Sequence, residues 1–428
     1  MDGRPWRPQS EPSAINCDVD FMLPRPKWTS FFLRFVFLGW LLPFSLIGAG
    51  LEKQDLFVAG ENGCASYRIP AVVVTPQQAV LVACEARRDN RSDWGHIDLF
   101  VRRSIDGGRT WEKSRQLIGR EDLPADLAQN AAHASGEGKF TINNPTWISN
   151  DATGETHLLF CAEYARGFMI TTRDGGATFS APREITAAFQ TFRSRDSYPW
   201  KVIAIGPGHG TRLASGRLVA AVWLATGEGG NAHRPSICAT IYSDDRGITW
   251  HAGEVVARDP DPLRNPSETA VVEIAPGQVM LNIRSDSPNN RRAIAIGRDG
   301  ATGWSQPYFD EALWEPVCMA SPIRYDPSGS PHPAFLLFSN PASLEKNPKT
   351  PAQSASRIRQ DLTLRASRDG GKTWPVQRLL QAGASAYSDL AVTADGHILC
   401  FYERGEKDPY EKLTLARFPS AWLLSDPR

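Results

Sequence analysis

An arginine at the start of an apolar segment is the first residue of this 428-residue chain whose surroundings suggest chemistry. Arg68 lies in the segment Ser66-Tyr67-Arg68-Ile69-Pro70, and the apolar run 71–74 follows it, as at the beginning of a strand directed into the interior. A buried guanidinium needs a carboxylate partner, because an unpaired charge is costly to remove from water. That partner can belong to the protein or to a ligand, so Arg68 is a candidate for binding an acidic group.

A polar loop follows at residues 87–96, with the sequence RRDNRSDWGH. It contains Asp89 and Asp93, and Asp98 lies just beyond it. A carboxyl group in such a loop can transfer a proton to or from a substrate, although loop aspartates are usually solvated turn residues. The residues alone do not distinguish among the three aspartates.

A repeated segment indicates which elements position these residues. It reads SIDGGRTW, TRDGGATF, SDDRGITW and SRDGGKTW around Asp106, Asp174, Asp245 and Asp369. The intervals are 68, 71 and 124 residues, and the long third interval predicts a degenerate fifth copy at Asp299. Each copy, an Asp box, is expected to form a tight turn between two strands, with the aspartate accepting backbone hydrogen bonds and glycine providing positive φ. The boxes therefore identify a fold and take no part in a reaction.

The mean spacing of about 66 residues holds four short strands, which is one blade of a β-propeller. Residues 51–428 correspond to roughly 5.7 such units. We therefore predict an all-β fold, a six-bladed β-propeller of four-stranded antiparallel blades, in which strands within 385–402 close the ring. No helical period predicts a second domain.

The Tyr-Arg-Ile-Pro motif before several Asp boxes resembles the exo-α-sialidase (neuraminidase) family with BNR repeats, of the secreted bacterial type, over residues 51–428. The resemblance implies that three arginines from separate blades bind the carboxylate of the substrate. The matching positions are Arg68, Arg284 and Arg359, and Arg357 remains an alternative to the third. Planar guanidinium groups suit this role because they bind carboxylates through paired, charge-assisted hydrogen bonds.

The same resemblance implies three catalytic residues. Tyr387 matches the nucleophile, and a neutral phenol avoids the repulsion that a carboxylate would meet beside the carboxylate of a sialoside. A phenol with a pKa near ~10 needs a base, and Glu268 matches that position. The resemblance also selects Asp93 as the proton donor to the leaving alcohol.

Three further positions are implied with less specific motifs. Arg87 matches a contact to the ring-hydroxyl region of the sugar, and Asn144, after Asn143, stands where the family shapes the N-acyl pocket. His209, in the segment Gly206-Pro207-Gly208-His209-Gly210, is expected to belong to a shaped turn and not to touch the ligand.

Residues 1–50 differ from the rest of the chain. An apolar run at 35–50 follows Arg25, Lys27 and Arg34, as in a signal peptide, and Met22 opens a more ordinary one. The run is shorter than the ~20 residues that span a bilayer, and it ends in small residues. We expect cleavage near 49–51 and a mature protein without a stable membrane span, secreted or otherwise extracytoplasmic, in the periplasm or at the cell surface.

The overall composition limits the classes of partner and cofactor that we expect for this chain. The chain carries 47 basic and 47 acidic residues, so its balance does not predict binding to nucleic acid. No CxxC, HExxH or EF-hand pattern occurs, and we predict neither a catalytic metal nor another cofactor. The cysteines beyond the leader are widely spaced, as buried thiols are, and not like a disulfide framework. They are Cys64, Cys84, Cys161, Cys238, Cys318 and Cys400.

Two hypotheses of different classes follow. The first is a retaining exo-sialidase that removes terminal α-linked sialic acids from glycans, glycoproteins or glycolipids, with a trans-sialidase or a related nonulosonic-acid hydrolase as variants. The second is a propeller that binds acidic sugars or proteins without turnover. Binding would need the arginines but not Asp93, Glu268 and Tyr387, so the presence of all three favours an enzyme.

Overall fold

The computed structural model describes residues 50–330, 332–345 and 356–425. The predicted signal peptide, the start at Met22 and the 1–50 leader as a whole fall outside these residues, apart from residue 50. Within them the chain is almost entirely β-strand, with two short α-helices, α1 (Ala187–Ser194) and α2 (Ser420–Leu424). None of the described helices has the length and hydropathy needed to cross a bilayer.

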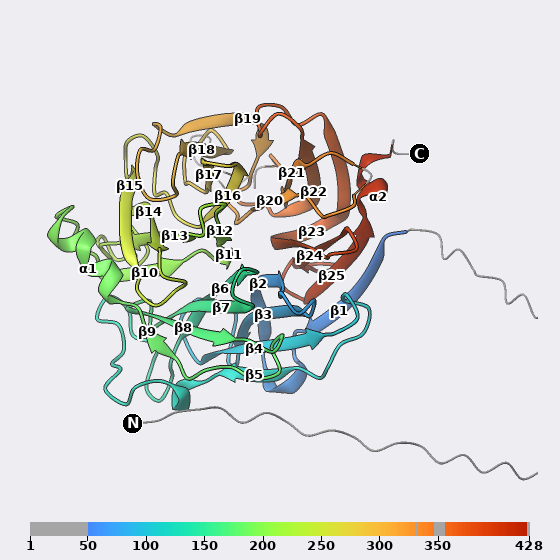
Figure 1. The fold of residues 1–428 in the computed structure, drawn as a ribbon. Helices are drawn as coiled ribbons and strands as arrows, with labels where there is room; N and C mark the ends of the chain where they lie inside the picture. Colours follow the sequence, from blue (N-terminus) through green and yellow to red (C-terminus); the bar gives the residue numbers. More distant parts are fainter. Residues whose placement is uncertain (1–49, 331, 346–355, 426–428) are drawn as a thin grey trace, which may run out of the picture. The chain divides into compact units, whose positions relative to one another are not determined.

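Four of the five sheets hold four or five strands each and lie side by side around a common centre (Figure 1). The first is β2 (Ser66–Val74), β3 (Val80–Arg87), β4 (Ile97–Ser104) and β5 (Arg115–Ile118). The second is β6 (Ile142–Asn150), β7 (Glu155–Ala162), β8 (Arg166–Thr172), β9 (Arg183–Glu184) and β11 (Gly208–His209). The third is β10 (Val202–Ile205), β12 (Thr211–Arg212), β13 (Leu218–Ala225), β14 (Ser236–Ser243) and β15 (His251–Arg258). The fourth is β16 (Thr269–Ala275), β17 (Gln278–Ile283), β18 (Arg291–Gly297) and β19 (Tyr308–Trp314).

The fifth sheet has seven strands because one long strand belongs to two units. Its strands are β20 (Ser321–Tyr325), β21 (Phe335–Pro341), β22 (Gln360–Ser367), β23 (Val376–Val392), β24 (His397–Arg404), β25 (Lys412–Pro419) and β1 (Glu52–Val58). The first half of β23 pairs with β22 and the second half with β24, with Gly383 at φ 73° between them. β1 pairs with β25, so the start of the described chain completes the last unit.

These sheets confirm the predicted all-β propeller. Dividing the seven-stranded sheet at β23 gives six units of four or five strands, although hydrogen bonds join the last two units into one sheet. Among the named strands of the described residues the pairing is antiparallel except between β11 and β6, which run parallel, and an isolated bridge between Ile97 and Thr141 is also parallel. The predicted closing strands at 385–402 lie in β23 and β24.

The Asp boxes form the turns that their sequences predict. In the first box, Asp106 accepts hydrogen bonds from the Thr110 hydroxyl at 2.6 Å and from the Thr110 amide at 2.9 Å. Gly107 and Gly108 adopt φ of 72° and 87°. The degenerate box keeps the turn: Asp299 accepts the amides of Ala301 and Thr302 at 2.9 and 2.8 Å.

Apolar side chains fill the space between neighbouring sheets. Trp147, Phe160 and Phe168 of the second sheet pack with residues of the first, among them Leu81 and Leu99, and all five are fully buried. Each such side chain contributes about 1.5–3 kcal/mol when it leaves water. The six cysteines beyond the leader are also buried, each as a free thiol.

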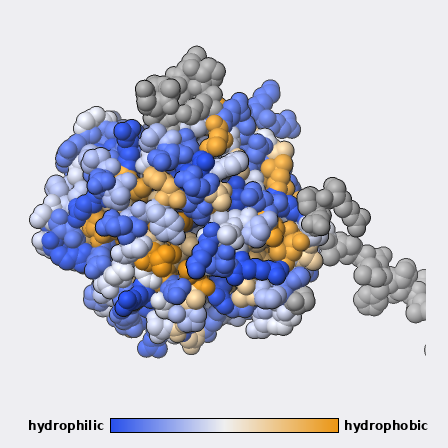
Figure 2. All heavy atoms as spheres, turned by 90° about the horizontal axis from the view of Figure 1, so that it is seen from above, coloured by the Kyte–Doolittle hydropathy of each residue, from blue (hydrophilic) through white to orange (hydrophobic). Residues whose placement is uncertain are grey.

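The inner strands bring distant segments together at the centre of the ring. β2 contacts both β6 and β23, and β20 contacts β16 and β23, so the first and last units meet. Seen from above in Figure 2, the surface is mainly hydrophilic, with hydrophobic residues gathered in small separate areas. The polar side chains that the sequence singles out lie at or near the inner strands.

Candidate active site

A cavity of about 430 Å³ opens where the inner strands begin. Seven of the eight predicted site residues line it, and they come from different sheets and loops of the ring. They are Arg68, Asp93, Asn144, Glu268, Arg284, Arg359 and Tyr387. The eighth, Arg87, is 1% exposed and lies behind Asp93.

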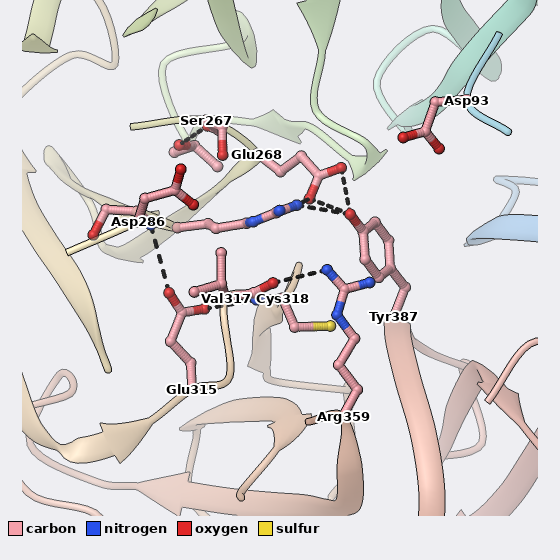
Figure 3. A network of polar contacts seen from close by, with 12 residues as sticks. Asp93, Ser267, Glu268, Asp286, Glu315, Val317, Cys318, Arg359 and Tyr387 are labelled. Carbon is pink, nitrogen blue, oxygen red and sulfur yellow. Dashed lines mark hydrogen bonds and ion pairs between the residues drawn. The ribbon is translucent and has the colours of Figure 1, made fainter. Parts of the chain in front are cut away.

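The hydroxyl of Tyr387 forms hydrogen bonds with a carboxylate and with a guanidinium group. It donates to both carboxylate oxygens of Glu268 at 2.6 Å, and Arg284 Nη1 donates to it at 2.7 Å (Figure 3). Arg284 also forms an ion pair with Glu268. A direct proton path therefore runs from the phenol to a carboxylate.

The hairpin of β16 and β17 explains the spacing between Glu268 and Arg284. Thr269 pairs with Ile283, so the next residues outward, Glu268 and Arg284, stand opposite one another at the ends of two antiparallel strands. Their backbones remain bonded, with the Arg284 amide donating to the Glu268 carbonyl at 3.2 Å. The separation of 16 residues is thus a consequence of the hairpin length.

Burial raises the pKa of Tyr387 well above its usual value, and Glu268 adds to this effect while Arg284, Arg359 and Arg68 oppose it. The phenol is consequently neutral over the whole neutral range. A neutral phenol becomes a good nucleophile only if a base removes its proton as it attacks. Glu268 is the carboxylate placed to do so.

Three inner strands bulge beside the cavity. The register shifts in β2 after Arg68, in β6 at Asn144 and in β23 at Tyr387. A bulge removes backbone groups from the ladder, and here buried carboxylates accept the freed amides. Glu403 accepts from Ile69 at 3.0 Å and from Tyr387 at 3.1 Å, and Glu85 accepts from Asn144 at 3.0 Å.

Arg68 is fixed by the same carboxylate. Its Nε and Nη2 donate to Glu403 at 2.9 and 3.3 Å, and its guanidinium lies 3.9 Å from the centre of the Tyr410 ring. Glu403 is fully buried, and burial alone would lower the pKa of Arg68, but Glu403 raises it well above the usual value. Arg68 is therefore a permanent cation with one edge bound to protein.

Arg359 and Arg357 occupy different surroundings. Arg359 donates to the Val317 carbonyl at 2.8 Å and to the Tyr410 hydroxyl at 3.0 Å, and it lies beside the Tyr387 ring. Arg357 also lines the cavity, but its side chain is 49% exposed and donates to Asp286 at 2.6 Å. Arg359 is the one of the two that approaches Tyr387.

Each of the three inner arginines keeps donors that no described residue uses. Arg68 Nη1 lies 4.0 Å from Asp93, beyond hydrogen-bonding distance. Arg284 bonds among the described residues only through Nη1, which leaves Nη2 free. Arg359 bonds through only two of its five N–H groups within the same part of the chain. Such buried free donors are suited to an anion that enters the cavity.

Asp93 lies apart from the Glu268–Tyr387 pair in Figure 3. Its carboxylate is 2.9 Å from Arg87 Nη2, and Arg87 also donates to the buried Glu85 at 2.6 Å. Burial acts to raise the pKa of Asp93, but Arg87 and Arg68 outweigh it and hold that pKa below its usual value. Asp93 is therefore a carboxylate at neutral pH.

The alternative aspartates lie outside the cavity wall. Asp89 pairs with Lys139 at 3.0 Å, and Asp98 pairs with Arg88 at 2.8 Å. His209 also lies outside the wall, and its Nδ1 is 2.6 Å from Asp389. Gly206 and Gly208 have φ of 57° and 98°, as the predicted turn requires, but His209 itself lies in the short strand β11 and not in the turn.

Sequence reasoning missed several residues of the site. Glu403 could have been found from the sequence, because it is an acidic residue within the otherwise largely apolar strand HILCFYER of β24. No sequence pattern indicates the aromatic wall of the cavity, because its residues come from separate elements. They are Tyr164, Trp223 and His233. Burial lowers the pKa of His233 in spite of Asp93 and Glu268, so its imidazole is neutral there.

Comparison with known proteins agrees with this geometry. A family model for a BNR repeat-like domain matches residues 92–400, and the curated relatives include several sialidases. The chain belongs to the sialidase family with BNR repeats. It is 31% identical to the sialidase of Micromonospora viridifaciens over 87% of this chain, and it spans only 54% of that relative.

Two other family members are matched over more of their own length. Sialidase-3 of Mus musculus is 26% identical over 90% of this chain and 96% of the relative. Among solved structures, the Hadza microbial sialidase Hz136 superposes with a TM-score of 0.70 at 26% identity, over 87% of this chain and 69% of that one. The shared propeller is therefore matched in sequence and in structure.

Proposed function

We propose that this protein is a retaining exo-sialidase, a glycoside hydrolase that removes terminal α-linked sialic acids from glycans, glycoproteins or glycolipids. The observation that carries the proposal is the hydrogen-bonded Tyr387–Glu268 pair in a cavity whose wall includes the guanidinium groups of Arg68, Arg284 and Arg359. A binding protein has no use for a phenol with a carboxylate acceptor at 2.6 Å. The named sialidases among its relatives support the same class.

The substrate carboxylate binds Arg68, Arg284 and Arg359 through the donors that the protein leaves free. An exposed ion pair is worth only ~0–1 kcal/mol. Hydrogen bonds to a charged group inside a protein contribute about 1.5–3 kcal/mol each, and donors fixed in advance need no reorganisation. The arginines thus orient the sugar so that its anomeric carbon faces Tyr387. Asn144 lies on the wall as a contact to the N-acyl side.

In the first chemical step, the Tyr387 oxygen forms a bond to the anomeric carbon while its proton passes to Glu268. The bond from that carbon to the glycosidic oxygen breaks, and the leaving oxygen takes a proton from Asp93. Asp93 must be protonated for this step. The substrate carboxylate offsets the charge of Arg68, which removes one cause of the low pKa of Asp93.

In the second step, water attacks the anomeric carbon of the tyrosyl intermediate. Asp93 takes a proton from the water, and Glu268 returns its proton to the departing Tyr387 oxygen. Two inversions at one carbon give net retention. Arg87 lies behind Asp93 and holds its carboxylate in place. Because Arg87 is buried, we propose this positioning role for it in place of the contact to the ring-hydroxyl region of the sugar that the resemblance implies.

Secretion completes the proposal. The signal-peptide pattern at 35–50 predicts an extracytoplasmic enzyme, where sialylated glycoconjugates are exposed. Edman degradation or mass spectrometry of the secreted protein tests this part, with a new N-terminus expected near 49–51. Intracellular retention of an uncleaved chain contradicts it.

The activity is tested with the 4-methylumbelliferyl glycoside of N-acetylneuraminic acid. We expect release of the fluorophore at some pH between about 4 and 8, the window in which a carboxyl pair can titrate. Proton NMR of the first sugar product should show the α-anomer before mutarotation. Absence of release over the whole range contradicts the proposal, and an initial β-anomer contradicts the retaining mechanism.

A further inference from the structure

A buried ion pair next to the cavity is not explained by the proposed mechanism. Arg292 of β18 and Glu315, directly after β19, are 0% and 1% exposed at their side chains, and Arg292 Nη1 lies 2.9 Å from Glu315 Oε2. Neither residue lines the cavity. A buried pair of this kind is often no more stabilising than apolar side chains of the same volume, so stability alone does not account for it.

The pair closes a strained turn. Val317 has φ of 51°, a conformation that a β-branched residue adopts only under constraint, at a cost of about 1–3 kcal/mol. The next amide, that of Cys318, donates to Glu315 Oε2 at 3.3 Å, while the Cys318 carbonyl accepts from Arg292 Nη1 at 2.7 Å. Both polar groups of Cys318 are thus bound by the ion pair, which holds Val317 in place.

The strained turn at Val317 also holds Arg359 of the site. The Val317 carbonyl accepts from Arg359 Nη2 at 2.8 Å, and Figure 3 shows Glu315, Val317 and Arg359 in succession toward Tyr387. A relaxed Val317 with negative φ would turn this carbonyl away from Arg359. Glu315 Oε1 also lies 3.5 Å from the amide of Ser285, the residue after Arg284.

We infer that Glu315, with Arg292 as its counter-ion, is a positioning residue for the carboxylate site. It acts through Val317 on Arg359, whereas the 3.5 Å separation of Glu315 and the Ser285 amide is too long to fix Arg284. The inference rests on the proposed function of these arginines. It assigns the ion pair to the affinity for the substrate carboxylate and not to the chemical step, because neither residue approaches the Tyr387–Glu268 pair.

A double-mutant cycle tests the coupling. Glu315→Gln should raise Kd for the 2,3-dehydro analogue of N-acetylneuraminic acid, measured by calorimetry, about tenfold, the worth of one charge-assisted hydrogen bond. KM for the fluorogenic glycoside should rise similarly, with kcat within about threefold. In an Arg359→Ala background the same substitution should change Kd and KM by less than about twofold.

Glu315→Gln leaves Arg292 buried without its counter-ion, which can prevent folding. The joint variant Arg292→Met with Glu315→Leu removes both charges, should fold, and should show the same rise in Kd and KM. Arg417→Met is the matched control: Arg417 is 4% exposed on β25, where it bonds Gly107 and Asp395 away from the cavity. It should lower Tm and leave Kd and KM unchanged.

The outcomes separate the two proposals. A wild-type protein that binds the analogue but releases no fluorophore contradicts the proposed activity and leaves the Kd cycle to test the positioning role. An active wild type with unchanged Kd in the folded variants overturns the inference. An equal rise in Kd with and without Arg359 overturns it as well, because a merely structural role would produce that result.

Discussion

The Asp boxes and the central cavity both use carboxylates to fix the backbone, but they draw their donors from different distances along the chain. Asp369 accepts the Thr373 hydroxyl and amide at 2.6 and 2.9 Å, from a residue four positions away. Glu403 accepts from Arg68 at 2.9 Å across 335 residues of sequence, and from Ile69 across 334. The box is complete within one turn, whereas the cavity exists only once the ring has closed.

The donors also differ in charge. The aspartates of the boxes at Asp106, Asp174, Asp245 and Asp369 accept from hydroxyl and amide groups, which leave no cation over for a ligand, whereas Asp299 of the degenerate box also accepts from Arg217 at 2.9 Å. The cavity carboxylates accept from arginines that each retain free N–H groups. An anion entering the cavity completes a set of bonds that the protein leaves incomplete. Local closure therefore serves stability, and incomplete long-range pairing serves binding.

Replacement of the central phenol should give the largest effect. Tyr387→Phe removes the oxygen that forms the glycosyl bond, and kcat for the fluorogenic glycoside should fall at least about a thousandfold. Tyr402→Phe is the matched control, since Tyr402 is fully buried on the neighbouring strand and its hydroxyl donates to Gln381 at 3.2 Å outside the cavity. Initial rates with both variants decide the matter, and a Tyr387→Phe enzyme of near-normal rate would remove Tyr387 from the mechanism.

Removal of the carboxyl group of Asp93, which lines the cavity, should give a smaller loss of activity that depends on the leaving group. Asp93→Asn should lower kcat/KM on sialyllactose about a hundredfold, but on the aryl glycoside less than tenfold, because a phenolate leaves without a proton. Asp89→Asn, whose parent residue pairs with Lys139 outside the cavity wall, is the control and should leave both rates unchanged. Equal losses on the two substrates would contradict the role of Asp93.

The pH dependence sharpens the same prediction. Burial acts to raise the pKa of Asp93, but Arg87 and Arg68 hold it below its usual value, so the protonated form is scarce above pH ~4. A bound carboxylate near Arg68 should raise that pKa. The basic limb of kcat, which reports the complex, should therefore lie at higher pH than that of kcat/KM, which reports the free enzyme. Coincident limbs would show that the substrate does not alter the field at Asp93.

The sequence predicts the local contacts of the boxes better than the long-range contacts of the cavity. The sequence predicts the box at Asp299 although the Ser, the second Gly and the Thr are missing from their expected places, because the aspartate and its amide donors lie within three residues of each other. The shared strand β23 was not predicted, since its two halves differ only in which distant strand each one pairs with.

The cavity divides in a similar way. Arg68, Glu268 and Tyr387 were identified by motif resemblance, and the structure brings them into one cavity. Glu403, which bonds Arg68 and the Tyr387 amide, is not identified in this way, and neither are Glu85 and Glu315, because each is defined by contacts with another strand or loop and by burial. A carboxylate in a strand is visible in sequence, but the bulge whose amide it accepts is a property of pairing.

Loss of a single box should have the smallest effect, and it should fall on stability alone. In Asp174→Asn, the bond from the Thr178 hydroxyl at 2.6 Å and those from its amide are weakened, and Tm should fall by about 2 °C with kcat/KM unchanged.

Hydrogen bonds from Thr178 lower the pKa of Asp174 to about 2, below the ~3.9 of an unfolded chain. The ionised carboxylate therefore stabilises the fold above pH ~4, and this contribution disappears as the pH falls toward 2. The difference in Tm between wild type and variant should shrink over that range, as differential scanning calorimetry can measure, while Asp151→Asn, in an exposed turn of the same sheet, should match wild type throughout. A Tm difference that is constant with pH would mean that the box stabilises through its shape alone, and a loss of activity would mean that box and cavity are coupled.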